Sequence, residues 1–329
     1  MIAAMAQFQI DQPPPSPPVD ISSPMEAINE VLTAMEAGYR AIFDALVGGL
    51  PPVEGVTSRT EIVNGVDGND IRLYIHEPAK RSGPVPAVVH AHGGGMMLGA
   101  AADLNYTRWR DELAAEGLVV VGVEFRNGSG ELGPHPFPAG LNDCATGTQW
   151  VIANKDALEI SSVITSGESG GANLSIATTL KAKQDGWLDG IEGVYAQCPY
   201  ISGTYAAPPP ELTSLYENDG YLLSNEMLAP MVRGYDPRLE HTTNPLAWPY
   251  FAEPTDLEGL PPHVISVNEL DPLRDEGLAY YRKLMAAGVT VSSRTVNGTC
   301  HAGDCIFARA IPEVYFGTVR DIASFAWSL

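Results

Sequence analysis

The stretch Val163-Ile-Thr-Ser-Gly-Glu-Ser-Gly-Gly-Ala-Asn-Leu174 decides the fold of this chain of 329 residues. Its β-branched start predicts a strand over 162–166, and the residues after the serine predict a helix over 170–184. Between them, a Gly-x-Ser-x-Gly pattern puts Ser169 in a sharp turn. Side chains two residues to either side of the serine would collide, so glycine is needed there. This context favours an exposed, reactive serine over a glycine-rich turn in which Ser169 only caps the helix.

Short β-rich runs alternate with helical stretches on both sides of this unit. The runs lie at 60–64, 71–76, 87–91, 119–125, 162–166, 192–198, 263–267 and 290–296, and the helices at 102–116, 139–155, 170–184, 273–287 and 313–327. Such alternation predicts an α/β fold with a mostly parallel sheet covered on both faces by helices. A hairpin-like turn, Asn64-Gly-Val-Asp-Gly-Asn69, joins the first two runs, so we expect the sheet to begin antiparallel.

Two segments lie outside this alternation. Residues 1–55 contain one helical pattern over 24–47, and residues 200–255 are long, rich in proline and aromatic. A connection of that length inside a compact domain is usually functional. We therefore expect 1–55 to be an N-terminal cap element and 200–255 a cap insertion over a core formed by 56–199 and 256–329.

Glycine also follows the third β-rich run, in His92-Gly93-Gly94-Gly95. Consecutive glycines let backbone N–H groups approach an oxygen closely, which suits an oxyanion hole for a tetrahedral intermediate. We expect its donors to come from Gly93, Gly94 and Gly95, together with Gly170 just after the serine. A metal pair formed by His90 and His92 is the weaker interpretation, because no third ligand is evident nearby.

A serine hydroxyl needs a base, and in folds of this kind the acid and then the histidine follow the serine in the chain. The histidines after Ser169 are His241, His263 and His301. His241 falls in the expected cap insertion, and His263 opens a strand. His301 lies in a loop after the last strand, where the base is needed, so we predict that His301 is the base.

The acid that orients this base is expected in the loop after the strand at 263–267. This loop offers Glu269, Asp271 and Asp275. Asp271 stands directly before a helix that proline can start, where a carboxylate can also act as a helix cap. We predict that Asp271 is the catalytic acid and keep Asp275 in reserve.

Charge and composition exclude several classes of partner. The chain has 19 basic and 40 acidic residues and a net charge of −21. Such a surface repels phosphate backbones and anionic lipid headgroups, so we expect no nucleic-acid and no membrane partner. Asp11 and several prolines interrupt the N-terminal residues, which is untypical of a secretory signal.

The cysteines agree with a cytoplasmic location. Cys144, Cys198, Cys300 and Cys305 are few for this length and lack CxxC spacing, so free thiols are expected, with a Cys300–Cys305 bridge as the alternative. The run Gly128-Ser-Gly-Glu-Leu-Gly133 formally matches a dinucleotide motif. Prolines replace the helix that this motif requires, so we treat the match as accidental.

Taken together, these motifs resemble the bacterial hormone-sensitive-lipase-like esterases. The resemblance covers residues from about 70 to the end and rests on HGGGM (92–96), GESGGANLSIATTL (167–180), CPYISGTYA (198–206), NPLAWPYFAE (244–253) and NELDPLRDEG (268–277). It implies an α/β-hydrolase fold with an eight-stranded core, a two-part cap, and carboxylic-ester hydrolysis without a cofactor. It also implies catalytic roles for Ser169, Asp271 and His301.

Two residues depart from the commoner Gly-Asp-Ser-Ala-Gly elbow of these esterases. Glu168 is the larger carboxylate, and we expect it to brace a neighbouring loop. Gly170 stands in place of alanine and predicts a slightly roomier oxyanion site.

The expected substrate is a neutral carboxylic ester, with a lactone among the candidates. We expect Met96, Met97, Tyr205 and Trp248 to contact it, because methionines and aromatic side chains make an apolar, adaptable pocket. An amidase or peptidase with the same triad, and a non-catalytic small-molecule binder, are the alternative functions. The protein is expected to be a monomer or a homodimer.

Overall fold

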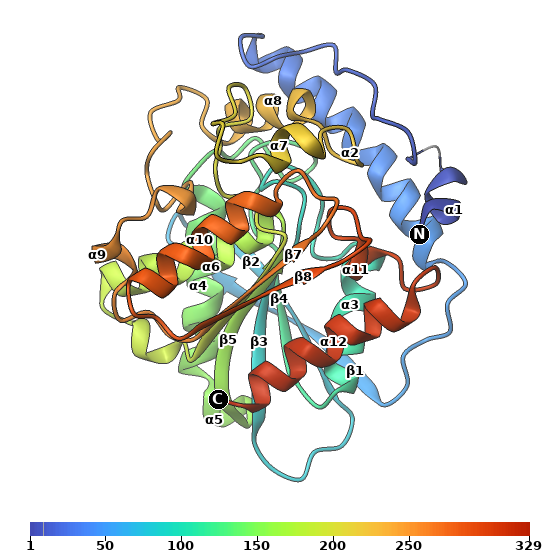
Figure 1. Ribbon diagram of the computed structural model, residues 1–329. Coiled ribbons are helices and arrows are strands. Elements are labelled where there is room, and N and C mark those ends of the chain that lie inside the picture. Colours follow the sequence, from blue (N-terminus) through green and yellow to red (C-terminus); the bar gives the residue numbers. More distant parts are fainter. Residues whose placement is uncertain (9) are drawn as a thin grey trace.

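One eight-stranded sheet organises the computed structural model, which describes residues 1–8 and 10–329 (Figure 1). The strands are β1 (Val56–Asn64), β2 (Asp70–Pro78), β3 (Val85–Ala91), β4 (Val119–Val123), β5 (Ile160–Glu168), β6 (Gly193–Gln197), β7 (His263–Asn268) and β8 (Val291–Val296), in the order β1-β2-β4-β3-β5-β6-β7-β8. β2 is antiparallel to both its neighbours, and the other pairs are parallel. The predicted sheet and its antiparallel start are confirmed.

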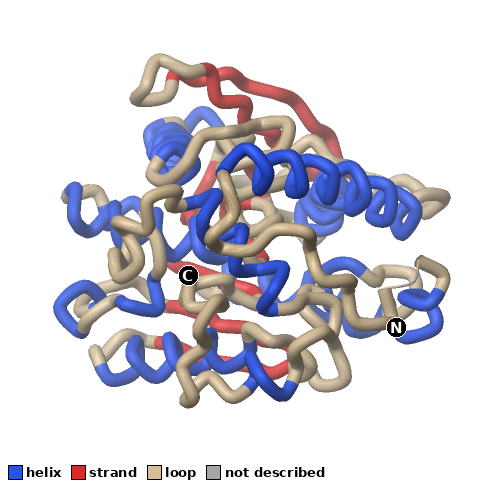
Figure 2. Tube along the Cα trace, turned by 90° about the horizontal axis from the view of Figure 1, so that it is seen from above, coloured by secondary structure: helices blue, strands red, loops and turns tan. Residues whose placement is uncertain are grey.

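Helices cover both faces of this sheet (Figure 2). They are α1 (Ile2–Ala6), α2 (Met25–Val47), α3 (Leu104–Ala115), α4 (Ala139–Ala153), α5 (Lys155–Leu158), α6 (Gly170–Asp185), α7 (Ser214–Glu217), α8 (Asn225–Tyr235), α9 (Pro254–Leu257), α10 (Arg274–Ala286), α11 (Gly303–Ile306) and α12 (Pro312–Trp327), with short 3-10 turns at Leu188–Gly190 and Pro249–Phe251. No helix starts at the Gly128 motif, which removes the dinucleotide interpretation.

The core divides according to the two-residue period of the strands. Val88 on β3 packs with side chains of α3 and α12, whereas the next residue, Val89, packs with side chains of α4 and α6. Further along the sheet, α10 joins α6 on that second face. The central strands are therefore buried on both sides, which explains their continuous apolar sequences.

The long helix α2 crosses the molecule above the sheet, beside α8 (Figure 1). Its buried stripe runs Ile28, Leu32, Glu36, one residue per helical turn. The carboxylate of Glu36 accepts hydrogen bonds from the backbone N–H of Gly99 at 2.7 Å and of Glu131 at 2.8 Å. These bonds tie α2 to two loops at the C-terminal side of the sheet. Within the described parts of the chain, no helix combines the length and apolarity needed to cross a bilayer.

Candidate active site

The predicted serine turn is a sharp reversal between β5 and α6. Ser169 has φ 57° and ψ −119°, which is strained for a residue with a side chain. A Cβ atom at Gly167 would lie 2.5 Å from the backbone carbon of Gly171, and one at Gly171 would lie 1.9 Å from the carbonyl oxygen of Ala91. Glycine is therefore required at both positions, as the sequence predicts.

The glycines after His92 form a second tight turn, which we call the oxyanion loop (residues 93–99). Gly94 and Gly95 have φ of 104° and 64°, and a Cβ atom at Gly94 would lie 2.1 Å from the carbonyl oxygen of Leu98. The carbonyl of Gly94 accepts hydrogen bonds from the N–H groups of Met97 and Leu98, both at 3.0 Å. Only glycine can follow this path without strain.

Gly170 packs directly against the oxyanion loop. A Cβ atom there would lie 2.5 Å from the amide nitrogen of Met96 and 2.7 Å from that of Gly95. The expectation of a roomier site is therefore wrong, because loop backbone fills the space that an alanine methyl would need. Among the residues that the structure describes, no acceptor pairs with the backbone N–H of Gly94, Gly95 or Gly170.

Glu168 braces the oxyanion loop, as we expected from its size. Its carboxylate accepts a hydrogen bond from the N–H of Gly93 at 2.7 Å and lies 2.9 Å from Nε2 of His90. The prediction that Gly93 can donate to an oxyanion needs correction, because this N–H already has an acceptor. His92 stacks on Phe125 with ring centroids 4.2 Å apart, and burial lowers its pKa to about 3, so its ring is neutral.

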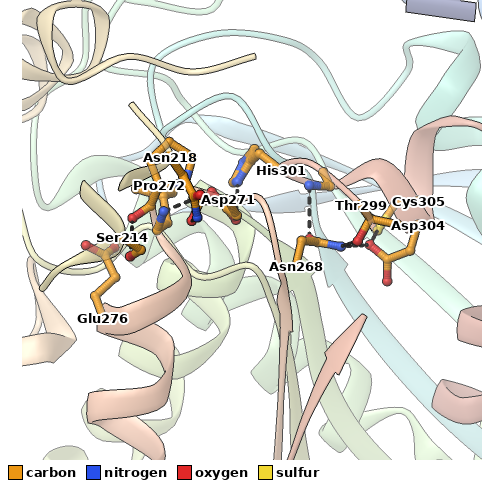
Figure 3. Close-up of polar contacts among 12 residues, drawn as sticks. Ser214, Asn218, Asn268, Asp271, Pro272, Glu276, Thr299, His301, Asp304 and Cys305 are labelled. Atoms are coloured by element: carbon orange, nitrogen blue, oxygen red, sulfur yellow. Dashed lines mark hydrogen bonds and ion pairs between the residues drawn. The ribbon is translucent and has the colours of Figure 1, made fainter. Parts of the chain in front are cut away.

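The predicted base and acid are hydrogen-bonded to each other (Figure 3). Nδ1 of His301 lies 2.8 Å from Oδ2 of Asp271, and both side chains are buried. The other oxygen of Asp271 accepts the N–H of Leu273 at 2.9 Å, and α10 begins one residue later. These contacts hold Asp271 in one orientation toward the imidazole.

The other candidate acids and bases have different partners. Asp275 accepts hydrogen bonds from Thr213 and Ser214, and Glu269 accepts one from the N–H of Gly298. Nδ1 of His263 bonds to the carbonyl of Pro261. The side chain of His241 lies 3.4 Å from that of Asn244. Among these candidate acids and bases, Asp271 and His301 are therefore the pair that is hydrogen-bonded to each other.

Ser169 and His301 line the same cavity, together with Gly93, Gly94 and Gly95 of the oxyanion loop. The rest of the lining is largely apolar and comes from remote parts of the chain. α2 contributes Met35, Tyr39, Ile42 and Phe43, and α8 contributes Met227, Leu228 and Met231. These seven α2 and α8 residues are called the pocket wall below.

The four residues expected to contact substrate lie elsewhere. Met96, Met97, Tyr205 and Trp248 are all buried and do not line this cavity. Sequence reasoning placed the α2 residues on a helical stripe but missed their part in the pocket. The available signal was the width of the apolar stripe on α2. A helix that has more apolar residues than the core buries leaves some of them facing a cavity.

The donor atoms suit proton transfer better than metal binding. Within residues 1–8 and 10–329, one group of three candidate ligands lies within 4.8 Å: Cys198, Asp271 and His301. Nδ1 of His301 is already bonded to Asp271, and burial raises the pKa of the Cys198 thiol well above its usual range, so the thiol keeps its proton. His90 and His92 belong to no such group in the described chain. All four cysteines are free, as predicted.

Comparison with known proteins agrees with this geometry. A model of the α/β-hydrolase fold matches residues 88–303. Carboxylesterase NlhH of Mycobacterium tuberculosis is 32% identical over 267 residues (79% of each chain), and an arylesterase of Saccharolobus solfataricus is 30% identical over 276 residues (82% of this chain, 86% of that protein). The solved structure of brefeldin A esterase, described as a bacterial homologue of human hormone-sensitive lipase, has a TM-score of 0.97 and 46% identity, covering 100% of this chain and 92% of that one. The chain therefore belongs to the α/β-hydrolase family, among its hormone-sensitive-lipase-like esterases.

Proposed function

We propose that this serine carboxylesterase hydrolyses neutral esters by acyl transfer to Ser169, with His301 as base and Asp271 as its orienting acid. The observation that carries the proposal is the hydrogen bond of 2.8 Å between Nδ1 of His301 and Oδ2 of Asp271, beside a cavity that His301 shares with Ser169. A bond at Nδ1 leaves Nε2 of the same ring to take the serine proton.

The reaction then proceeds in two steps. Ser169 attacks the ester carbonyl as His301 removes its proton, and Asp271 stabilises the imidazolium that forms. His301 returns the proton to the leaving alcohol. Water attacks the acyl-enzyme in the same way and releases the acid. The proposal requires no cofactor.

Three backbone N–H groups are proposed to stabilise the oxyanion: those of Gly94, Gly95 and Gly170. They have no acceptor within the described residues, and Gly170 packs closely against the backbone of Gly95. Fixed donors of this kind do not have to reorient as the negative charge develops. They are therefore effective in a site shielded from water. Gly93 acts indirectly, because its N–H anchors the loop to Glu168.

The substrate is proposed to be a neutral ester with a bulky apolar part. Methionine and aromatic side chains dominate the pocket wall, and charged groups at its edge, such as Arg40 and Asp103, already pair with each other. The likeness to brefeldin A esterase extends the proposal to lactones. Met96, Met97, Tyr205 and Trp248 are proposed to support the lining from behind.

The segments 1–55 and 200–255 are proposed to act as a two-part cap on the core of 56–199 and 256–329. Both contribute residues to the cavity that contains Ser169. We propose a cytoplasmic location, which the free thiols of all four cysteines support. The proposed assembly is a monomer or a homodimer, which sedimentation equilibrium measures directly.

Labelling with a fluorophosphonate probe tests the proposal. The wild-type protein should be labelled, and Ser169→Ala should lose both labelling and at least about 10⁴-fold of its p-nitrophenyl acetate hydrolysis. Ser161→Ala, at the exposed start of the same strand, is the matched control and should keep both.

Retained labelling or turnover in Ser169→Ala would refute the nucleophile. A matched ester and amide pair separates an esterase from an amidase, and faster turnover of the amide would overturn the substrate class. Absence of turnover with tight ligand binding would indicate a binder instead of an enzyme.

A further inference from the structure

We propose that Asn268 is a positioning residue that sets the place of the His301 imidazole. The inference rests on the proposed function of His301 and goes beyond it. Asn268 is the last residue of β7, three residues before Asp271, and its side chain is buried. It lies between the loop that carries the acid and the loop that carries the base (Figure 3).

The side chain of Asn268 bonds to the His301 loop at three points. Its Nδ2 donates to Oγ1 of Thr299 at 2.7 Å and to Oδ1 of Asp304 at 2.9 Å. Its Oδ1 accepts the backbone N–H of Ala302 at 3.2 Å. Thr299 lies two residues before His301, Ala302 one residue after it and Asp304 three residues after it. One amide group therefore holds the histidine from both sides.

The partners of Asn268 are themselves anchored in the core. Oδ2 of Asp304 accepts a hydrogen bond from Oγ1 of Thr318 on α12 at 2.9 Å. Oγ1 of Thr299 donates to the carbonyl of Val296, at the end of β8, at 2.6 Å. The side chains of Asn268, Thr299, Asp304 and Thr318 are all buried, so their bonds form away from competing water. The network connects β7, β8 and α12 through the His301 loop.

The loop needs this support because its backbone is strained. Ala302 has φ 52°, a left-handed conformation that is unfavourable for a residue with a side chain. Its N–H points to Asn268, so the amide holds the strained residue directly beside the base. A bond to Asp271 fixes the imidazole at Nδ1. Asn268 fixes the backbone from which that imidazole extends, and a shift of about 1 Å in such a group can cost about 100-fold in rate.

Exchanging the amide and the carboxylate tests the role. Asn268→Asp places a carboxylate against Asp304 and breaks the pairing. Asp304→Asn keeps an amide oxygen that can accept from Nδ2 of Asn268, while its own NH2 can donate to the rotated hydroxyl of Thr318. In the double variant the amide of residue 304 can donate to the carboxylate of residue 268, which still accepts the N–H of Ala302. The hydroxyls of Thr299 and Thr318 can rotate to complete the network.

Activity should be measured as kcat per active site titrated with the fluorophosphonate, with KM and the unfolding midpoint alongside. Asn268→Asp should lose about 10- to 100-fold in kcat per site and Asp304→Asn less than about 3-fold, both with KM within about 3-fold of wild type. The double variant should recover to within about 5-fold of wild type. Thr299→Val, which removes one acceptor of Asn268, should lose about 10-fold. Thr148→Val removes a buried hydroxyl within α4 and is the matched control, with kcat unchanged.

A purely structural role predicts a different result. The stability of Asn268→Asp would fall while its kcat per titrated site stayed within about 3-fold of wild type, and that outcome would overturn the inference. A double variant no faster than Asn268→Asp would also overturn it. If Asn268→Asp does not fold, the comparison of Thr299→Val with Thr148→Val decides. Failure of the proposed function is separate, because the wild-type protein would then form no adduct at Ser169.

Discussion

The two sides of the pocket differ in what lines them, backbone on one side and flexible side chains on the other. The reactive side, residues 91–99 and 167–171, consists of backbone packed so closely that a methyl group at Gly170 or Gly171 would meet main-chain atoms within 2.5 Å. The pocket wall consists of flexible side chains from α2 and α8. Close-packed backbone has one arrangement, whereas methionine-rich surfaces adapt to different shapes. Close packing therefore fixes the positions of the reactive groups. Substitutions in the pocket wall can change the substrate preference without moving those groups.

The two sides touch at a few points. A Cβ atom at Gly95 would lie 2.4 Å from Cε of Met231, so the tip of this α8 side chain rests on the oxyanion loop. Glu36 of α2 accepts the N–H of Gly99 at the other end of the same loop. Changes in the wall should affect binding first, and changes in the reactive side should affect the rate of the chemical step.

The largest effect is expected at the acid. Asp271→Asn should lower kcat about 10⁴-fold, because an amide that accepts the Leu273 N–H offers an N–H where His301 needs an acceptor. Asp275→Asn is the matched control, since that carboxylate bonds to Thr213, Ser214 and Arg274 and not to His301. Its kcat should stay within about 3-fold. Steady-state kinetics on p-nitrophenyl acetate measures kcat for both variants. Equal losses of kcat in the two variants would remove Asp271 from the proposed triad.

The next effect is expected where the elbow meets the oxyanion loop. Gly170→Ala should lower kcat about 10²–10³-fold with a smaller change in KM, because the new methyl displaces the amides of Gly95 and Met96. Gly38→Ala is the control, since a Cβ atom there meets nothing within 4 Å. It should leave kcat unchanged. Wild-type kcat in Gly170→Ala would show that the loop is not held as tightly as described.

A smaller effect should separate the pocket wall from the core behind it. Met231→Ala should raise the ratio of kcat/KM for a bulky ester over that for an acetate about 10-fold, because it opens space in the lining. Met97→Ala removes a buried side chain that lies against Gly128 and Gly234 outside the lining. It should lower the free energy of unfolding by about 2–5 kcal/mol and leave that ratio unchanged. A changed ratio in Met97→Ala alone would reverse this assignment.

The smallest expected effect is a dependence of stability on pH. Buried Glu276 accepts hydrogen bonds from the N–H of Ile201 at 2.7 Å and from the hydroxyl of Tyr205 at 2.9 Å, and burial raises its pKa to about 8. Between about pH 5 and 8 the folded state keeps a proton that the unfolded state has lost. The free energy of unfolding should therefore fall as pH rises through this window.

Urea unfolding of wild type and Glu276→Gln at a series of pH values measures that slope. The glutamine has no proton to lose, so the difference in stability between the two proteins should change between pH 5 and 8 and level off outside it. A constant difference would show that Glu276 is ionised throughout.

The reactive side was predictable from the sequence because its requirements are local. Glycine at 167, 171 and 94 reflects collisions with nearby backbone atoms, and the serine, acid and base follow β5, β7 and β8, parallel strands whose carboxyl ends lie at one edge of the sheet. The pocket wall was missed, although the width of the apolar stripe on α2 was a signal. The place of α2 in the fold had no signal, because α2 and the oxyanion loop lie far apart in the chain and meet through Glu36, whose carboxylate gives no sequence signal of its own. Met96 and Met97 come directly after the glycine run but turn into the core.

A structure of the phosphonylated protein tests the central claim most directly. We predict a phosphorus–oxygen bond to Ser169, a non-bridging oxygen about 2.7–3.1 Å from the amide nitrogens of Gly94, Gly95 and Gly170, and Nε2 of His301 within hydrogen-bond distance of the Ser169 oxygen. An adduct whose oxygen faces away from these amides, or an imidazole of His301 turned away from Ser169, would contradict the account.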